Sequence, residues 1–404
     1  MACALGPFPA LAGRQAIDVR GLWVPRSTLS SPDSITAMVR AAEAGGFNTL
    51  LLQVRGRGEA FYRSDLEPRA SELDRQPAAF DPLAVAIEAA HAAGLRVHAW
   101  INVNLVASGT TLPRSRDHVA MKHPEWLMAP RALAGTLRGI SPRSPAFVGT
   151  LARWTRAGSE QVEGLYLSPI LPASRAYTTS VVREIVARYP VDGIHLDYIR
   201  YPAAEFDHGP AALDEFRAVH GPRAPAAERT RLDRAGRTNP TAWVDMYPEA
   251  WAAFRRERLT ALVGQMAGAA RAARPSIVIS AAVVPAIALA HEHRFQDWLG
   301  WARTGLLDAA CPMIYTTDAA AFDASVVELA AALGETPLWA GIGAWRLPIA
   351  RTIDHVRIAR RRGADGVLLF SYDRLTADGT PAKSFAALRP VLLDAATGRG
   401  GAAR

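Results

Sequence analysis

The 404-residue sequence contains very little cysteine, almost no lysine and no long apolar run. Its two cysteines, Cys3 and Cys311, are too few for a disulfide framework or a four-cysteine zinc site. No stretch reaches the roughly 18 consecutive apolar residues that span a bilayer. Half of the residues are hydrophobic and 21% are charged, which excludes a globally disordered chain. What remains is a folded protein with an apolar core.

The positive charge is carried almost entirely by arginine. Lysine and arginine total 46 against 38 acidic residues, a formal net charge of +8, and only Lys122 and Lys383 are lysines. The arginines are scattered, and the chain has no long basic run or nucleic-acid-binding motif, which argues against nucleic acid as a partner. The nucleophile elbow, the phosphate-binding P-loop and the dinucleotide-binding fingerprint are also missing.

The two ends of the chain differ from the rest. Residues 1–16 lack a basic region followed by a long apolar segment, so they do not form a convincing signal peptide, and we expect a tail there. The glycine- and alanine-rich residues 394–404 are expected to form a flexible second tail. The periodic patterns of a folded domain lie between them, in residues 17–393.

Short β-like runs alternate with amphipathic helical stretches along residues 17–393. This alternation indicates parallel β-α-β units of the α/β class, and eight units indicate a closed (β/α)₈ barrel of the TIM type. Long insertions at about 102–176 and 203–242 follow the third and fourth strands, on the side where such barrels build active sites. The expected strands are residues 19–25, 48–54, 95–101, 193–198, 277–284, 309–314, 338–342 and 366–371.

The segment VDGIHLDYIRYP, residues 191–202, gives the strongest local signal. Alternation along a strand turns His195 and Asp197 toward the barrel axis, with Asp197 at the strand exit. A carboxylate is costly to bury there unless it is paired or functional. We therefore expect Asp197 to act as an acid, base or nucleophile, with a structural ion pair to Arg200 as the alternative. His195, one layer below, is either a substrate contact or a satisfied core residue.

Aromatic and polar side chains also follow the other expected strands. Aromatic rings stack on sugar rings and carboxylates carry out glycosidic chemistry, so the ensemble favours a carbohydrate. The second catalytic carboxylate is expected among Asp318, Glu59 and Asp373, with Asp318 favoured because it follows the sixth strand and faces the fourth across the barrel. The expected substrate-binding residues are Arg55, Trp100, Asn102, His195, Tyr198, Arg200, Tyr315, Trp345 and Tyr372.

A bound metal or cofactor has little support in the sequence. His291 and His293 form the only close histidine pair and stand without further spaced ligands, so neither a metal site nor a cofactor is expected. Three functions stay open: a glycoside hydrolase, a glycan-binding barrel without turnover, and a metal-dependent polysaccharide deacetylase. The glycan-binding barrel is favoured by the lack of an obvious second catalytic carboxylate. The deacetylase would use the histidine pair as part of a metal-ligand set.

These motifs, in this order, resemble the glycosyl-hydrolase-like 10 family of bacterial (β/α)₈ proteins. The resemblance implies hydrolysis of a glycan, often in the bacterial envelope or periplasm, with peptidoglycan strands stripped of their peptides as one known substrate. It maps the family's strand-four aspartate onto Asp197. The chain departs from the family at Glu59 and Ser168, where aspartate is usual. The matching segments include residues 20–24, 48–68, 80–103, 123–127, 166–169, 191–202, 296–316 and 363–373.

Family 18 chitinases offer a second comparison at the same strand. Their Asp-x-x-Asp-x-Asp-x-Glu pattern, laid on Asp192, falls here on His195, Asp197 and Ile199. Isoleucine stands where those enzymes carry the catalytic glutamate, so their substrate-assisted mechanism is not expected. Asp197 is left as the best general acid or nucleophile.

Several arginines lie at or near expected strand exits. Arginine binds a carboxylate bidentately, and peptide-free peptidoglycan exposes the lactyl carboxylate of muramic acid, which chitin lacks. The arginines and the family resemblance together predict a preference for glycans that contain muramic acid over chitin oligomers. The arginines concerned are Arg26, Arg55, Arg57 and Arg200.

Overall fold

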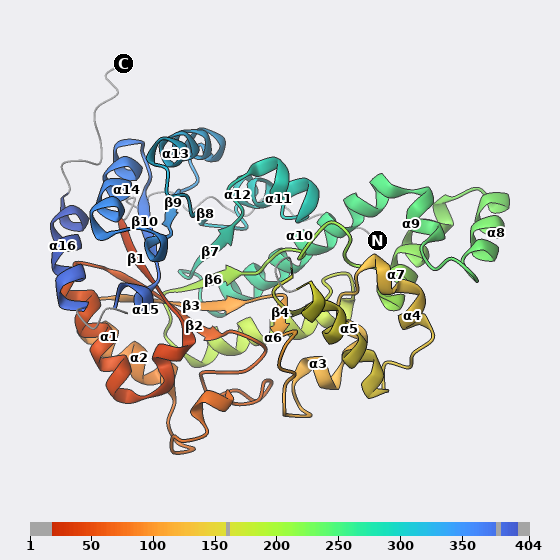
Figure 1. Cartoon of the computed structure of the whole chain (residues 1–404), viewed down its shortest axis with the longest axis horizontal. Helices are drawn as coiled ribbons and strands as arrows, with labels where there is room; N and C mark the ends of the chain where they lie inside the picture. The colour runs from red at the N-terminus through yellow and green to blue at the C-terminus, as the bar shows by residue number, and fades with distance from the viewer. Residues whose placement is uncertain (1–17, 159–161, 377–380, 395–404) are drawn as a thin grey trace.

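The computed structural model describes residues 18–158, 162–376 and 381–394. The expected N-terminal tail, and all of the expected C-terminal tail except Asp394, lie outside the described residues. Eight parallel strands close into a barrel in the order β1-β10-β9-β8-β7-β6-β3-β2 (Figure 1), so the predicted (β/α)₈ fold is confirmed. They are β1 (Val19–Val24), β2 (Thr49–Arg55), β3 (Arg96–Asn102), β6 (Gly193–Asp197), β7 (Val278–Val283), β8 (Ala309–Ile314), β9 (Trp339–Ile342) and β10 (Gly366–Phe370).

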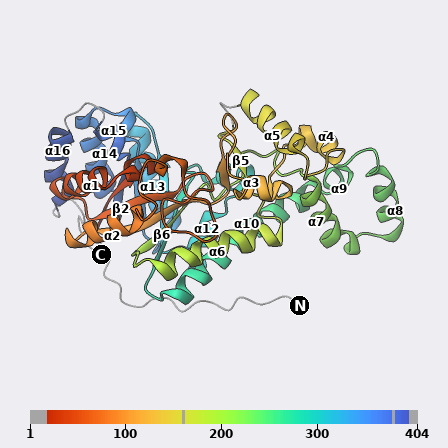
Figure 2. The same cartoon turned by 90° about the horizontal axis from the view of Figure 1, so that it is seen from below.

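Helices surround the barrel (Figures 1 and 2). The first, α1 (Pro32–Ala44), starts at the capping box of Ser31 and Ser34 and ends at Gly45. No helix in the described parts of the chain is long and apolar enough to cross a membrane. The other helices around the barrel are α2 (Pro82–Ala92), α6 (Pro172–Arg188), α10 (Pro248–Ala273), α11 (Ile287–His293), α12 (Trp298–Arg303), α13 (Ala319–Leu333), α14 (Ile349–Arg361), α15 (Tyr372–Leu375) and α16 (Pro381–Leu393).

Two long segments between barrel strands carry elements of their own. The first insert, residues 103–171, follows β3, and the second insert, residues 198–247, follows β6. Their helices gather at one end of the molecule, away from α1, α14 and α16 (Figures 1 and 2). The first contains β4 (Leu105–Ala107), α3 (Val119–Lys122), α4 (Ala134–Arg138), α5 (Pro145–Ala157) and β5 (Leu165–Tyr166), and the second contains α7 (Pro210–His220), α8 (Ala226–Ala235) and α9 (Ala242–Met246).

Side chains on β6 alternate as the sequence predicts. Ile194 and Leu196 belong to the core between the strands and the helices. A Cβ atom on Gly193 would lie 2.5 Å from the Nδ1 atom of His98, so glycine leaves room there for that histidine. The apolar residues that fill the barrel interior form a separate cluster of Val19, Trp23, Leu51, Trp100, Ala309, Cys311, Trp339 and Leu368.

Aspartates close the amino-terminal end of three alternate strand pairs, β3–β6, β7–β8 and β9–β10. The Asp192 carboxylate accepts a hydrogen bond from Val97 N at 2.8 Å, and Asp308 accepts one from Ile279 N at 2.7 Å. The carboxylate of Asp365 repeats the arrangement on the next strand pair but one, with Leu338 N at 3.0 Å. Each bond ties the start of one strand to its neighbour.

A fully buried ion pair links β2 to the loop that follows it. Arg55 and Glu67 are both 0% exposed, and Arg55 Nη2 lies 2.7 Å from Glu67 Oε1. The Arg55 guanidinium also donates to the carbonyl oxygens of Asn102 and Val103, where the first insert begins. Arg55 therefore holds the strand ends together from inside, and its side chain has no exposed surface for the substrate contact expected of it.

Replacing Arg55 with methionine should destabilise the fold by about 3–5 kcal/mol, because the buried Glu67 carboxylate would lose its countercharge. Urea unfolding monitored by tryptophan fluorescence measures this. Replacing Glu67 with leucine in the same chain should recover much of the loss. The exposed pair of Arg362 and Asp323 is the matched control, and Arg362→Ala should leave the unfolding midpoint almost unchanged. A single Arg55 variant as stable as the native protein would contradict this account.

A second buried carboxylate, Asp207, joins the two inserts. Its Oδ1 atom accepts hydrogen bonds from Ala129 N of the first insert at 2.9 Å and from Gly209 N at 3.1 Å. The Oδ2 atom has no hydrogen-bond partner among the described residues, and the nearby Ser168 side chain acts to lower the pKa of this carboxyl group. Burial raises the pKa of Asp207 to about 6, despite these hydrogen bonds and the nearby charge of Arg255.

Stability should fall as the pH rises from about 4 to about 6, because the folded state holds the Asp207 proton more tightly than the unfolded state does. The shift from 3.8 to about 6 corresponds to about 3 kcal/mol. Urea unfolding of the native protein and of Asp207→Asn, in parallel over this pH range, tests it. The asparagine variant should lose this pH dependence, whereas Asp323→Asn at the surface should retain it. Parallel curves for the native and Asp207→Asn proteins would refute the assignment.

Candidate active site

Asp197 is the last residue of β6, at the carboxyl end of the barrel. Its carboxylate accepts hydrogen bonds from Trp100 Nε1 at 3.1 Å and from Tyr198 N at 2.6 Å. Arg200 Nη1 lies 3.6 Å from Asp197 Oδ1, an ion pair longer than a hydrogen bond. The residue is 7% exposed. Three neighbours from the same strand end and from β3 therefore fix one carboxylate where barrels place their catalytic groups.

Burial raises the pKa of Asp197. The positive charge of Arg200 and the hydrogen bonds from Tyr198 and Trp100 oppose this effect without cancelling it, and the charge of Glu163 adds to it. A carboxyl group in this environment holds its proton closer to neutral pH than a solvated one does. That property suits a general acid.

The backbone turns sharply after Asp197. Tyr198 has a φ of 49°, in the left-handed region that bulky residues rarely adopt. This turn aims Tyr198 N back at the carboxylate, and the Arg200 guanidinium lies 4.2 Å from the centre of the Tyr198 ring. Burial and the charge of Asp197 raise the pKa of Tyr198 to about 12, so its hydroxyl stays protonated.

Glu163 is a carboxylate that the sequence reading missed. It precedes β5 in the first insert, its side chain is 41% exposed, and Arg200 Nη2 lies 3.3 Å from its Oε1 atom. Tyr166 donates a hydrogen bond to its Oε2 atom at 2.6 Å. No strand pattern or motif marks this residue, because it belongs to an insert rather than to a barrel strand.

Aromatic rings surround the Asp197 end of the barrel. Trp100 is 4% exposed, so it contacts Asp197 from the interior and presents little surface for stacking. Tyr315, at the end of β8, stacks on Phe370 with ring centres 5.7 Å apart. Burial and the charge of Asp197 raise the pKa of Tyr315 well above 10, so its hydroxyl remains a donor. Trp345, just after β9, is 49% exposed and has the most open ring of this group.

His195 lies in the layer below Asp197 and is 0% exposed. Trp23 Nε1 donates to its Nε2 atom at 3.0 Å, so its Nδ1 carries the proton and donates to Ser280 Oγ at 2.9 Å. Burial lowers the pKa of His195 well below 6.5, which keeps the ring neutral. The structure thus supports the core alternative for His195 rather than a substrate contact.

Two other expected substrate contacts point elsewhere. Asn102 is 3% exposed, and its side chain donates to Gly56 O at 2.7 Å and accepts from Gln53 Nε2 at 3.3 Å, so it fixes the loop after β2. Tyr372 is half-buried in α15 and packs toward α16, with its ring centre 6.1 Å from that of Phe385. Asn102 is nevertheless the strand partner of Asp197 across β3 and β6, so it lies beside the candidate site with its side chain bonded to the loop.

The three carboxylates expected as partners of Asp197 have other neighbours. Asp318, the favoured one, is exposed and caps α13 by accepting hydrogen bonds from Ala320 N and Ala321 N at 2.7 and 3.1 Å. These bonds lower the pKa of Asp318. Asp373 accepts a hydrogen bond from Ser371. Glu59 is half-buried, and burial raises its pKa, with the charge of Glu72 adding to the effect.

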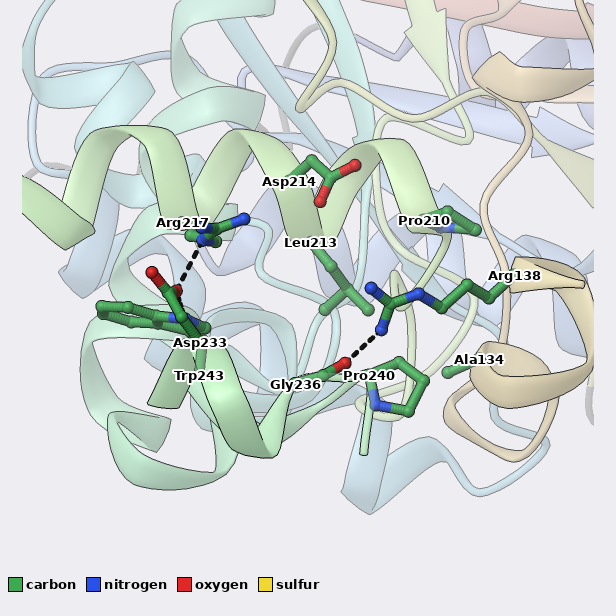
Figure 3. Close-up of a pocket in the computed structure, with 10 residues that line it drawn as sticks. All are labelled: Ala134, Arg138, Pro210, Leu213, Asp214, Arg217, Asp233, Gly236, Pro240 and Trp243. Carbon is green, nitrogen blue, oxygen red and sulfur yellow. Dashed lines mark hydrogen bonds and ion pairs between the residues drawn. The ribbon is translucent and has the colours of Figure 1, made fainter. Parts of the chain in front are cut away.

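Two hollows lie on the inserts, away from these residues. One of about 130 Å³ is lined by α4, α7 and the segment from α8 to α9 (Figure 3). Its Arg217 pairs with Asp233 at 2.8 Å, and its Arg138 donates to Gly236 O, so both arginines are engaged within the protein. The other, about 850 Å³, is lined by residues 121–125, 141–145 and 148. Among the described residues, no three His, Cys, Asp or Glu side chains are grouped so as to hold a metal ion.

The sequence pattern of the family described as Glycosyl hydrolase-like 10 matches residues 18–337. The chain belongs to this family.

Two curated relatives carry the name glycosyl hydrolase. DigH of Escherichia coli K12 is 23% identical over 353 residues, which cover 76% of this chain and 67% of DigH. YngK of Bacillus subtilis 168 is 28% identical over 162 residues, which cover 39% of this chain and only 26% of YngK. The alignments therefore span about a quarter of one relative and two thirds of the other.

Solved glycosidase structures share the fold of this family member. The glycoside hydrolase domain of PgaB (BpsB) from Bordetella bronchiseptica superposes with a TM-score of 0.61 at 12% identity, covering 92% of this chain and 99% of that one. The catalytic domain of β-amylase from Paenibacillus polymyxa gives a TM-score of 0.61 at 12% identity, covering 93% of this chain and 98% of that one. At these identities the likeness shows the fold alone.

Replacing Trp100 with phenylalanine should raise the pKa of Asp197 further. The indole N–H bonds to the ionised carboxylate and stabilises it, and phenylalanine removes that bond. Titration of the carboxyl resonances by ¹³C NMR, assigned with an Asp197→Asn variant, measures the shift. The packing of the ring against Phe370 should survive. Trp345→Phe, which replaces an exposed ring, is the control and should leave the pKa of Asp197 unchanged. An unchanged or lowered midpoint in Trp100→Phe would contradict the bond's role.

Proposed function

We propose that this protein hydrolyses glycosidic bonds in a bacterial envelope glycan, with Asp197 as the general acid. The observation that carries the proposal is the buried carboxylate at the carboxyl end of β6, held by Trp100 and Tyr198. Its raised pKa favours the protonated form, which can donate to the leaving glycosidic oxygen. Family membership and the names of the relatives support the same reaction.

The groups around Asp197 fit a sugar. Trp345 exposes half of its ring just after β9 and offers a flat apolar surface on which a pyranose can stack. Its neighbour Arg346 donates to Tyr315 O at 2.9 Å, which ties this loop to the end of β8. Tyr315 and Tyr198 keep their hydroxyl protons and are suited to donate hydrogen bonds to sugar oxygens.

Peptide-free peptidoglycan is the substrate that the family resemblance and the arginines favour. Arg57 is exposed after β2, and partial burial and the nearby charge of Arg26 lower its pKa. Arg26 itself lies 3.3 Å from Glu72, an exposed ion pair that a substrate carboxylate would have to replace. Two guanidinium groups at this rim suit the lactyl carboxylate of muramic acid. Arg55 is buried against Glu67, so its guanidinium is not available to a substrate carboxylate.

The function is tested by incubating the purified protein with peptide-free peptidoglycan strands and with chitin oligomers, with and without a chelator, and following the products by mass. We expect shorter glycans that contain muramic acid, faster than chitin is cleaved, and no effect of the chelator. Binding without products would establish the glycan-binding barrel instead. Release of acetate that the chelator abolishes would establish the deacetylase. Equal turnover of both glycans would refute the preference for muramic acid.

Replacing Asp197 with asparagine should reduce turnover about 10²–10⁴-fold, because the side chain keeps its shape and loses its transferable proton. The aromatic surfaces remain, so glycan binding should persist. Turnover on the preferred glycan and a thermal unfolding scan are the measurements. Asp318→Asn, which preserves the cap of α13, is the matched control and should stay within a few-fold of native. Native-like activity of a folded Asp197→Asn would remove this residue from the mechanism.

A further inference from the structure

A single guanidinium group joins a carboxylate of the barrel to a carboxylate of the first insert. Arg200 Nη1 lies 3.6 Å from Asp197 Oδ1, and Arg200 Nη2 lies 3.3 Å from Glu163 Oε1. The Arg200 side chain is only 10% exposed, and its face rests on the Tyr198 ring. Because the cation is buried and fixed, it also fixes the two carboxylates relative to each other.

The two carboxylates differ in their access to solvent. The Asp197 side chain is 10% exposed, whereas that of Glu163 is 41% exposed. An ion pair to so exposed a carboxylate contributes little to stability. Stability therefore does not account for a second carboxylate at this position, while a water molecule or a sugar can reach it.

The surroundings also separate the protonation states of the pair. Burial raises the pKa of Asp197. Burial acts on Glu163 in the same sense, but the charge of Arg200 and the hydrogen bond from Tyr166 outweigh it and lower the pKa of Glu163. The proton is therefore held more tightly on Asp197 than on Glu163, which is the order required of an acid and a base.

We infer that Glu163 is the second catalytic carboxylate, the base that accepts a proton from the attacking water. This inference rests on the proposed glycosidase function. The water oxygen bonds to the anomeric carbon as its proton passes to Glu163. The bond from that carbon to the glycosidic oxygen breaks, its electron pair leaves with that oxygen, and Asp197 supplies the proton that the oxygen takes. Arg200 then stabilises the ionised Asp197.

Replacing Glu163 with glutamine tests the assignment on the glycan that the native protein cleaves. Glutamine keeps an oxygen for Arg200 but cannot accept the proton, so kcat should fall about 10²–10⁴-fold while the dissociation constant of the glycan stays within a few-fold. Glu205→Gln, at an exposed glutamate on the second insert, is the matched control and should keep native activity.

Azide separates a base from a residue that only positions Arg200. Azide attacks the anomeric carbon without losing a proton, so it should restore turnover to Glu163→Ala and yield a glycosyl azide, whereas a displaced Arg200 would not be rescued. Native-like turnover of Glu163→Gln, or inactivity of Glu163→Ala that azide does not relieve, would overturn the inference. In either case the proposed function would still hold if the native protein cleaves the glycan and Asp197→Asn does not. A native protein that cleaves no glycan would remove both.

Discussion

The candidate site depends on one buried carboxylate and the groups that make its burial tolerable. Desolvation of Asp197 is offset by two hydrogen bonds and by an arginine that approaches without forming a hydrogen bond of its own. A closer arginine contact would stabilise the ionised form more strongly and remove the proton that a general acid needs. The length of this ion pair therefore matters to the chemistry as much as its presence does.

The layers beneath the site are neutral or internally paired. His195 is locked between Trp23 and Ser280 in its uncharged form, and Arg55 is neutralised by Glu67 within the loop after β2. Ionic groups in the interior of the barrel would change the pKa of Asp197 through the low dielectric around it. With these groups neutralised, Arg200 and Glu163 are the charged residues that shift the pKa of Asp197.

Much of the barrel could be predicted from the sequence, because strand periodicity, helix caps and glycine stops are local signals. Asp197 could also be predicted, since its place at a strand exit follows from alternation along 193–197. The residues around it were harder to predict. Arg55 could have pointed into the site or toward Glu67. The outcome depends on the path of the loop after β2, which no local sequence pattern encodes. Asp318 reads equally well as a catalytic carboxylate or as a helix cap. Glu163 is separated from Arg200 by 37 residues, and nothing in its own segment marks it.

The proposed acid and its inferred partner come from different parts of the chain. Asp197 belongs to a barrel strand that must keep its register with both neighbours, whereas Glu163 stands on an insert that contacts the barrel beyond the strand ends. Inserts of this kind can be lengthened, shortened or exchanged without disturbing the barrel's hydrogen bonds. In this architecture the proposed chemistry can therefore be altered through changes in a loop, while the barrel and the aspartate at its strand end stay in place.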